Sequence, residues 1–85
     1  MTREEIRALV LGALGGVAPE IDTATIDARV SLREQCDLDS VDYLNFLVAV
    51  HAATGVDIPE ADYAKLEKLD DVIEYVAAQR GGTAG

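Results

Sequence analysis

One serine lies among three carboxylates in the segment CDLDSVDYLNF, residues 36–46. Ser40 directly follows Asp39, and Asp37 and Asp42 lie within three positions of it. From the residues alone, this hydroxyl has three candidate uses: a helix cap, the nucleophile of a hydrolase, or part of a calcium loop. Each use makes a different demand on the rest of the sequence.

Helix capping demands the least. Ser and Asp are both strong N-caps, so Asp39 or Ser40 would accept hydrogen bonds from the first amides of a following helix. The positive end of that helix would also stabilise the carboxylates of Asp39 and Asp42. Composition alone favours this interpretation.

A hydrolase would need a histidine beside the serine. His51 is the sole histidine, eleven positions after Ser40, which on one helix is about 16 Å along the axis. A base must lie within hydrogen-bonding distance of its nucleophile, so this pair is excluded, and we expect His51 at the surface.

Cys36 is also a poor nucleophile, because neighbouring carboxylates raise the pKa of a thiol. We expect Cys36 in the core.

A calcium-binding EF-hand loop begins with the spacing of Asp37 and Asp39. Such a loop also needs an oxygen ligand at its fifth position, glycine at its sixth and glutamate at its twelfth. Those positions hold Val41, Asp42 and Val48. We therefore expect no metal site.

The element that must present Ser40 is a helix predicted over residues 40–54. This segment is almost continuously apolar and precedes Gly55, a typical helix stop. The side chains expected in the core are Tyr43, Phe46, Leu47 and Val50. The apolar side chains expected to face outward are Val41, Leu44 and Val48, and exposed apolar clusters often mark a docking surface.

A first helix is predicted over residues 3–15. Thr2 and Glu5 have the spacing of a capping box, and Gly15 and Gly16 supply a stop. The apolar positions recur at helical spacing: Ile6, Leu9, Val10, Ala13 and Leu14.

Residues 17–38 show no sustained period and predict a long loop. A loop of this length needs anchors of its own. We expect Ile26 and Leu32 to reach the core, with a short helical turn at residues 32–35.

Two more helices are predicted after Gly55. Pro59 suits the first position of a helix, and Tyr63 and Leu66 indicate about two turns. The segment LDDVIEYVAAQ predicts a final helix that ends near Gln79; its apolar stripe consists of Leu69, Val72, Ile73, Val76 and Ala77. Residues 81–85 are expected to lack order, so one domain spans residues 1–80.

Charge and composition limit the function. The chain has 16 acidic and 7 basic residues and a net charge of −9, which disfavours nucleic acid and favours partners with basic patches.

Cys36 is the one cysteine, so we expect no internal disulfide and a reducing, cytoplasmic setting. The apolar run at residues 8–18 is too short to span a bilayer, and Glu4 and Glu5 argue against a signal peptide. A single domain of this size has little room for a deep catalytic cleft.

Three motifs follow one another in a recognisable order. DLDSVD heads the apolar helix, GVDIP enters the short third helix, and LDDVIEYV forms the closing helix. Over residues 32–76 this set resembles the acyl carrier proteins and related phosphopantetheine-binding carrier domains, and DLDSVD looks like the family's Asp-Ser-Leu motif. The length, acidity and long first loop are also similar.

The resemblance implies an all-α fold: a four-helix bundle with a long loop between helices one and two and a short helix three. It implies a stand-alone carrier without catalytic activity. A phosphopantetheinyl transferase would modify Ser40 with coenzyme A as donor, and the thiol of the 4′-phosphopantetheine arm would hold acyl cargo as a thioester. Acyl-loading and acyl-transfer enzymes with basic docking patches would be the partners of a monomer. The residues they recognise would be Asp39, Val41, Asp42, Leu44 and Val48, with Asp37 a weaker contributor.

Some residues depart from the family's pattern. Asn45, His51 and Ala52 stand where acidic residues usually continue along the exposed side of the helix, which hints at a dedicated partner set rather than the general fatty acid synthase. Fatty acid and secondary metabolite biosynthesis both stay open. The alternatives are an aminoacyl or peptidyl carrier of a nonribosomal pathway, an unmodified helical adaptor and, ranked last, an esterase.

Overall fold

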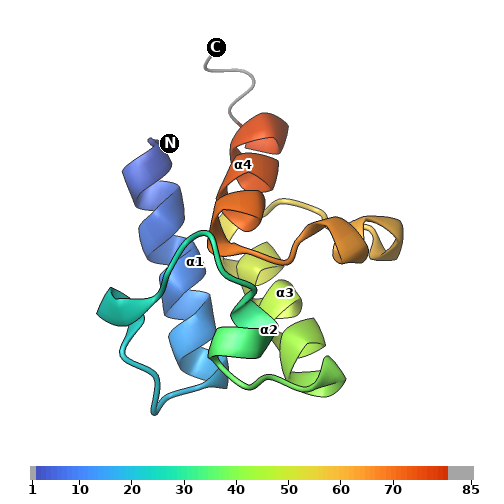
Figure 1. Ribbon diagram of the computed structural model, residues 1–85. Helices are drawn as coiled ribbons and strands as arrows, with labels where there is room; N and C mark the ends of the chain where they lie inside the picture. The colour runs from blue at the N-terminus through green and yellow to red at the C-terminus, as the bar shows by residue number, and fades with distance from the viewer. Residues whose placement is uncertain (1, 81–85) are drawn as a thin grey trace.

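Helices enclose one apolar core in the computed structural model, which describes residues 2–80 (Figure 1). The elements are α1 (Arg3–Val17), η1 (Thr23–Thr25), α2 (Leu32–Gln35), α3 (Ser40–Thr54), η2 (Glu60–Lys65) and α4 (Leu69–Arg80), of which η1 and η2 are 3₁₀ helices. The predicted all-α fold, with a long loop after α1 and a short helix before α4, is confirmed. The expected tail, residues 81–85, lies outside the described residues.

The start of α1 is as predicted, but its end is not. The Thr2 hydroxyl accepts a hydrogen bond from the Glu5 amide at 3.1 Å, and the Glu5 carboxylate accepts one from the Thr2 amide at 2.8 Å. The hydrogen bonds to Thr2 hold the pKa of Glu5 below its usual value. The helix then continues through the two glycines to Val17. Neither glycine adopts the left-handed backbone that ends a helix, and the two extra residues carry Ala18 into the core.

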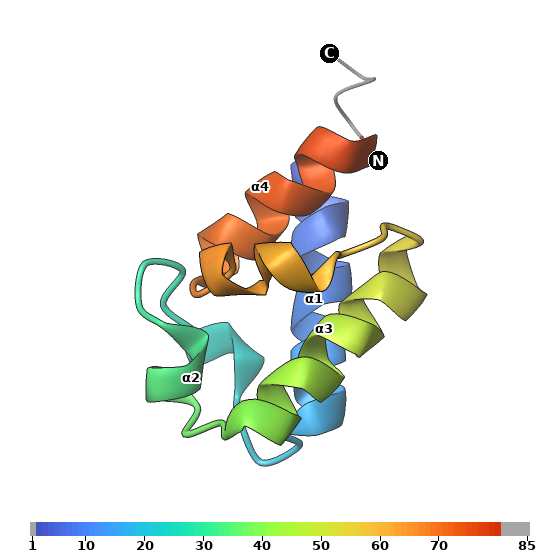
Figure 2. The same ribbon diagram turned by 90° about the vertical axis from the view of Figure 1, so that its right-hand side faces the viewer.

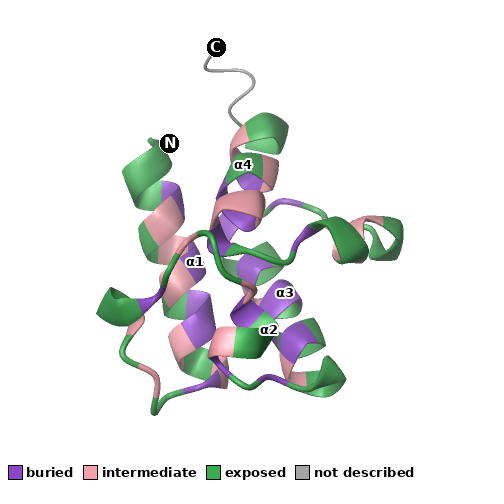
Figure 3. Ribbon diagram, viewed as in Figure 1, coloured by how far each residue is buried: buried purple, intermediate pink, exposed green. Residues whose placement is uncertain are grey.

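The core lies where α1 packs against α3 and α4, and the buried faces of these helices turn toward one another (Figure 3). Phe46, the one phenylalanine, is fully buried. The other side chains with almost no exposed surface are Ile6, Val10, Leu14, Leu32, Leu47, Val50, Leu66, Leu69, Val72, Ile73 and Val76. All four side chains of α3 that were expected in the core are buried. No helix within residues 2–80 is long and apolar enough to cross a membrane.

The loop between α1 and α2 is anchored at several points. Ile26 and Leu32 are buried, as predicted, and the Leu32 amide donates to the Glu67 carbonyl at 2.8 Å. The side chain of Gln35 adds three hydrogen bonds: it donates to the carbonyls of Asp27 (2.8 Å) and Val30 (2.9 Å) and accepts from the Asp27 amide (3.0 Å). Two buried side chains and the hydrogen bonds of Gln35 together fix a loop that has little secondary structure of its own.

The short third helix has the predicted length of about two turns but begins one residue later than predicted. Pro59 occupies the N-cap, one residue before the helix, and the turns are 3₁₀. Figure 2 shows η2 crossing in front of α1, between α3 and α4. The Tyr75 hydroxyl of α4 donates to the Asp62 carboxylate at 2.7 Å. This hydrogen bond raises the pKa of Tyr75 to about 12 and holds that of Asp62 below its usual value, so the donor and the charged acceptor both persist at neutral pH.

Replacing Gln35 with alanine should destabilise the domain. The loss of three hydrogen bonds should lower the free energy of unfolding by about 1–3 kcal/mol, because the loop groups they satisfy lose their partners. Urea unfolding followed by circular dichroism measures this. Gln79→Ala, at an exposed position near the end of α4, is the control. Equal stability of the two variants would mean that Gln35 does not anchor the loop.

Candidate functional site

A left-handed turn joins α2 to α3. The Leu38 amide donates to the Arg33 carbonyl at 3.0 Å, and Asp37 between them has a φ of 53°. This bond, from the second residue past the helix cap back to the last turn, is the one that closes a Schellman motif, which needs a left-handed residue at this place. Asp enters that region more readily than most residues. The turn therefore brings the last residues of α2 next to the start of α3.

Asp39 is the N-cap of α3. Its carboxylate accepts a hydrogen bond from the Asp42 amide at 2.8 Å, and its carbonyl accepts one from the Tyr43 amide at 2.9 Å. Of the two candidate caps, it is thus Asp39 that serves. Ser40 is the first residue of the helix, and its side chain is left for another use.

The Ser40 hydroxyl faces solvent beside a cation that the sequence analysis missed. Ser40 is exposed, and Nη2 of Arg33 donates to its Oγ at 3.4 Å. The Arg33 guanidinium also lies over the ring of Tyr43, 5.8 Å from its centroid. The helical turn at residues 32–35 was predicted, but sequence spacing alone did not reveal that its arginine would fold back on Ser40.

A hollow of about 250 Å³ opens next to Ser40. Its lining residues are Arg33, Ser40, Tyr43, Leu44, Tyr63 and Ala64, which come from α2, α3 and η2. Tyr43 is buried, and its hydroxyl makes no hydrogen bond with any described residue. Burial is the main cause that raises the pKa of Tyr43 to about 12. The hydroxyl therefore stays protonated at neutral pH.

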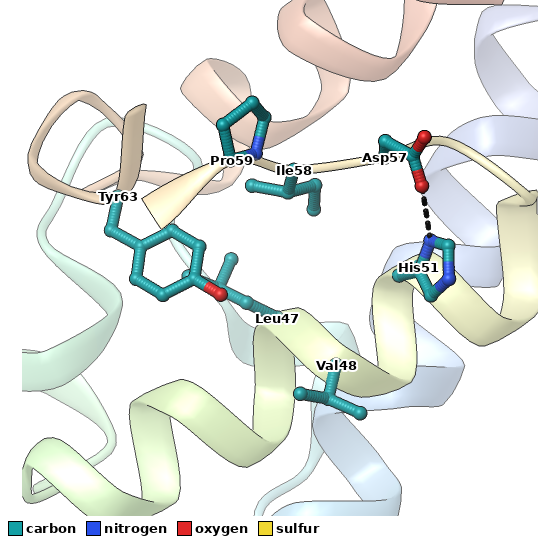
Figure 4. A pocket seen from close by; sticks show the side chains of 7 residues that line it. All are labelled: Leu47, Val48, His51, Asp57, Ile58, Pro59 and Tyr63. Atoms are coloured by element: carbon teal, nitrogen blue, oxygen red, sulfur yellow. Dashed lines mark ion pairs between the residues drawn. The ribbon is translucent and has the colours of Figure 1, made fainter. Parts of the chain in front are cut away.

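A second hollow, of about 360 Å³, lies further along α3 (Figure 4). Its lining residues are Leu47, Val48, His51, Asp57, Ile58, Pro59 and Tyr63, and Tyr63 thus borders both hollows. His51 is exposed, as expected, and its Nδ1 lies 2.8 Å from the Val56 carbonyl and 3.6 Å from the Asp57 carboxylate. His51 shares α3 with Ser40, eleven positions away, so the geometry that excluded a catalytic pair holds.

Three apolar side chains of α3 face solvent. Val41 is 64% exposed, Leu44 44% and Val48 54%. Their spacing of three and four residues places them on one face of the helix. Their exposure was predicted and is confirmed. Their use for docking stays a prediction.

Neither a reactive thiol nor a metal cluster accompanies this surface. Cys36 is buried, and burial raises the pKa of its thiol, which makes it a poor nucleophile. Within residues 2–80, no three His, Cys, Asp or Glu side chains gather closely enough to hold a metal ion. Ser40 presents an exposed hydroxyl at the start of α3.

Comparison with known proteins places this geometry in a family. A family model described as a phosphopantetheine attachment site matches residues 4–76. An acyl carrier protein from Campylobacter hominis is 33% identical over 73 residues, 86% of each chain. One from Campylobacter jejuni is 28% identical over 75 residues, 88% of this chain and 91% of the relative. The fold matches a solution structure from Anaplasma phagocytophilum, described as that of a candidate acyl carrier protein, with a TM-score of 0.82 and 25% identity over 95% of this chain and 94% of the other.

Replacing Asp39 should separate its structural role from its charge. Asp39→Ala removes the cap and should lower the free energy of unfolding by about 1 kcal/mol. Asp39→Asn keeps an oxygen acceptor in the same place and should retain most of that stability. Urea unfolding of both variants tests this. If asparagine and alanine destabilise equally, the hydrogen bond to the Asp42 amide does not stabilise α3.

Proposed function

Because the chain belongs to the acyl carrier protein family, whose members have a phosphopantetheine attachment site, we propose that Ser40 is the residue to which the 4′-phosphopantetheine arm is attached. The family's proteins are carriers rather than enzymes, and phosphopantetheine is their cofactor. One observation carries the choice of residue. Ser40 has an exposed side chain that is not the cap of α3. Ser31, the only other serine, already caps α2 through its hydroxyl.

The surroundings of Ser40 fit the base of the arm. A phosphodiester on its oxygen would lie at the N-terminus of a 15-residue helix, where backbone amides and the helix dipole favour negative charge. The Arg33 guanidinium adds a donor on one side. When bound, the arm supplies a thiol that holds the cargo as a thioester, while the residues of this chain hold and orient its base.

The cargo we propose is an acyl group. The two hollows lie in a line along α3, on either side of Tyr63, and both are lined largely by apolar side chains. Such a surface between α3 and η2 suits the shelter of an aliphatic chain whose burial is favoured by the hydrophobic effect. Among the described residues, η2 has no fully buried side chain, and a hydrogen bond between Tyr75 and Asp62 ties it to α4, so few buried contacts of this wall need to change when cargo enters.

We assign docking of partner enzymes to the start and exposed face of α3. Asp39 and Asp42 supply negative charge beside Ser40, which would attract the basic patches of a phosphopantetheinyl transferase and of acyl-loading and acyl-transfer enzymes. Val41, Leu44 and Val48 supply short-range apolar contact. Asn45 and Ala52 are exposed on the same helix and uncharged. Negative charge is therefore concentrated near Ser40, which supports a dedicated set of partners.

The attachment residue can be identified by intact mass. After incubation with coenzyme A and a broad-specificity phosphopantetheinyl transferase, the wild type should gain the mass of one phosphopantetheinyl group. Ser40→Ala should gain nothing, whereas Ser31→Ala should be modified like the wild type. A wild type that gains no mass would support the unmodified adaptor instead, and a gain that survives Ser40→Ala would place the arm elsewhere.

Charge steering can be tested at Asp42. Its backbone amide donates to the Asp39 cap, but its carboxylate makes no hydrogen bond or ion pair with the described residues, so Asp42→Asn changes charge with little effect on the fold. Transfer of the arm should slow several-fold at low salt, and the difference should shrink as salt screens the charges. Glu4→Gln, an equal change of charge in the first turn of α1, is the control. Unchanged rates for Asp42→Asn at low salt would argue against steering.

A further inference from the structure

The proposed attachment site poses an electrostatic problem. A phosphodiester carries a negative charge, and Asp37, Asp39 and Asp42 surround Ser40 in a chain whose net charge is already −9. The first turn of α3 offers partial positive charge, but one of its amides is already bonded to Asp39. A full positive charge close to the oxygen of Ser40 would offset this repulsion.

Arg33 is the cation in that place. Its Nη2 lies 3.4 Å from Ser40 Oγ, so the phosphorus atom bonded to that oxygen would bring further oxygens within reach of the guanidinium. Two other cations are paired with carboxylates elsewhere: Arg3 pairs with Asp70 and Glu74 of α4, and Lys65 pairs with Asp62. Among the described residues, Arg33 forms no ion pair with any carboxylate, despite the three aspartates nearby.

The fold also limits where this guanidinium can go. The carbonyl of Arg33 accepts the hydrogen bond that closes the α2–α3 turn, which fixes its backbone relative to Ser40. Its guanidinium lies over the Tyr43 ring, and a cation in this position is attracted to the face of the ring. A planar guanidinium presents parallel N–H donors that match two oxygens of a phosphate. Lysine would supply the charge without that geometry.

We propose that Arg33 binds the phosphodiester attached to Ser40 and thereby directs the arm across the hollow lined by Tyr43, Leu44, Tyr63 and Ala64. This inference rests on the proposed function, because it presupposes that Ser40 carries the arm. Arg33 is here a positioning residue. It offsets the charge of the phosphate and selects one direction for the arm, toward η2, from those that an exposed serine allows.

The test compares the apo and holo forms of Arg33→Gln, Arg33→Lys and Arg29→Gln. Arg29 is an exposed arginine of the loop before α2, so its replacement changes the net charge equally and serves as the control. In the wild type and in Arg29→Gln, attachment of the arm should change the Tm little. In Arg33→Gln, the holo form should melt about 2–4 °C below its apo form, because the phosphate then lacks its partner. Arg33→Lys should fall between them.

Amide NMR spectra supply a readout of direction. In the wild type, attachment should shift the amide signals of Leu44, Tyr63 and Ala64 as well as those next to Ser40. In Arg33→Gln, the signals next to Ser40 should still shift, while those of Tyr63 and Ala64 should lose most of their change. The conservative Arg33→Lys variant keeps the test decisive if Arg33→Gln folds poorly.

The outcomes distinguish the two proposals. A wild type that never acquires the arm overturns the assignment of Ser40 itself. If wild type, Arg33→Gln and Arg33→Lys all acquire it, and the holo-minus-apo differences in Tm and amide shifts agree within error, Arg33 does not bind the phosphodiester, while the proposed attachment at Ser40 stands.

Discussion

The site depends on one turn, in which the Leu38 amide donates to the Arg33 carbonyl across a left-handed Asp37. The turn reverses the chain within a few residues, so that α2 ends beside the first residue of α3. Leu32 and Leu38 are buried on either side of it, and their burial resists any opening of the turn. The Asp39 cap then starts α3 at once. As a result, an exposed serine lies at the positive end of a helix whose buried face forms part of the core.

Two segments near this turn, the loop before α2 and the helix η2, are held more loosely than the turn itself. The loop before α2 depends on hydrogen bonds from Gln35 and on the buried side chain of Ile26. η2 is a 3₁₀ helix without a side-chain cap, and its hydrogen-bond geometry is intrinsically poorer than that of an α-helix. Segments with few buried contacts open at a lower free energy than the core. A carrier needs this combination, because its attachment point must stay defined while the surface beside it admits and releases cargo.

Patterns in the sequence predicted the structural features that depend on interactions between residues close together in the chain. The capping box of Thr2 and Glu5 and the stop at Gly55 each involve groups a few residues apart, and α3 combines a clear stop with a long apolar run. The sequence patterns failed to predict features that depend on tertiary packing. Gly15 and Gly16 permit a helix to end, but burial of Ala18 keeps α1 going. The contacts of Gln35 with Asp27 and of Arg33 with Ser40 join residues seven or eight positions apart across irregular backbone, for which no periodic rule exists.

The distribution of charge along α3 indicates how partner enzymes would bind the proposed docking face. An acidic helix would attract basic partners along its whole length, but here the exposed positions beyond Asp42 include Asn45, Ala52 and the apolar Leu44 and Val48. On the proposed docking face, attraction at long range would therefore centre on the end that bears Ser40, and apolar contact would follow along the helix. Charge complementarity at Asp39 and Asp42 would select partners with basic patches, and the fit of their apolar surface to Val41, Leu44 and Val48 would add to that selection. A surface of three partly exposed aliphatic side chains is small. It favours short-lived complexes, which is what successive delivery to several enzymes requires.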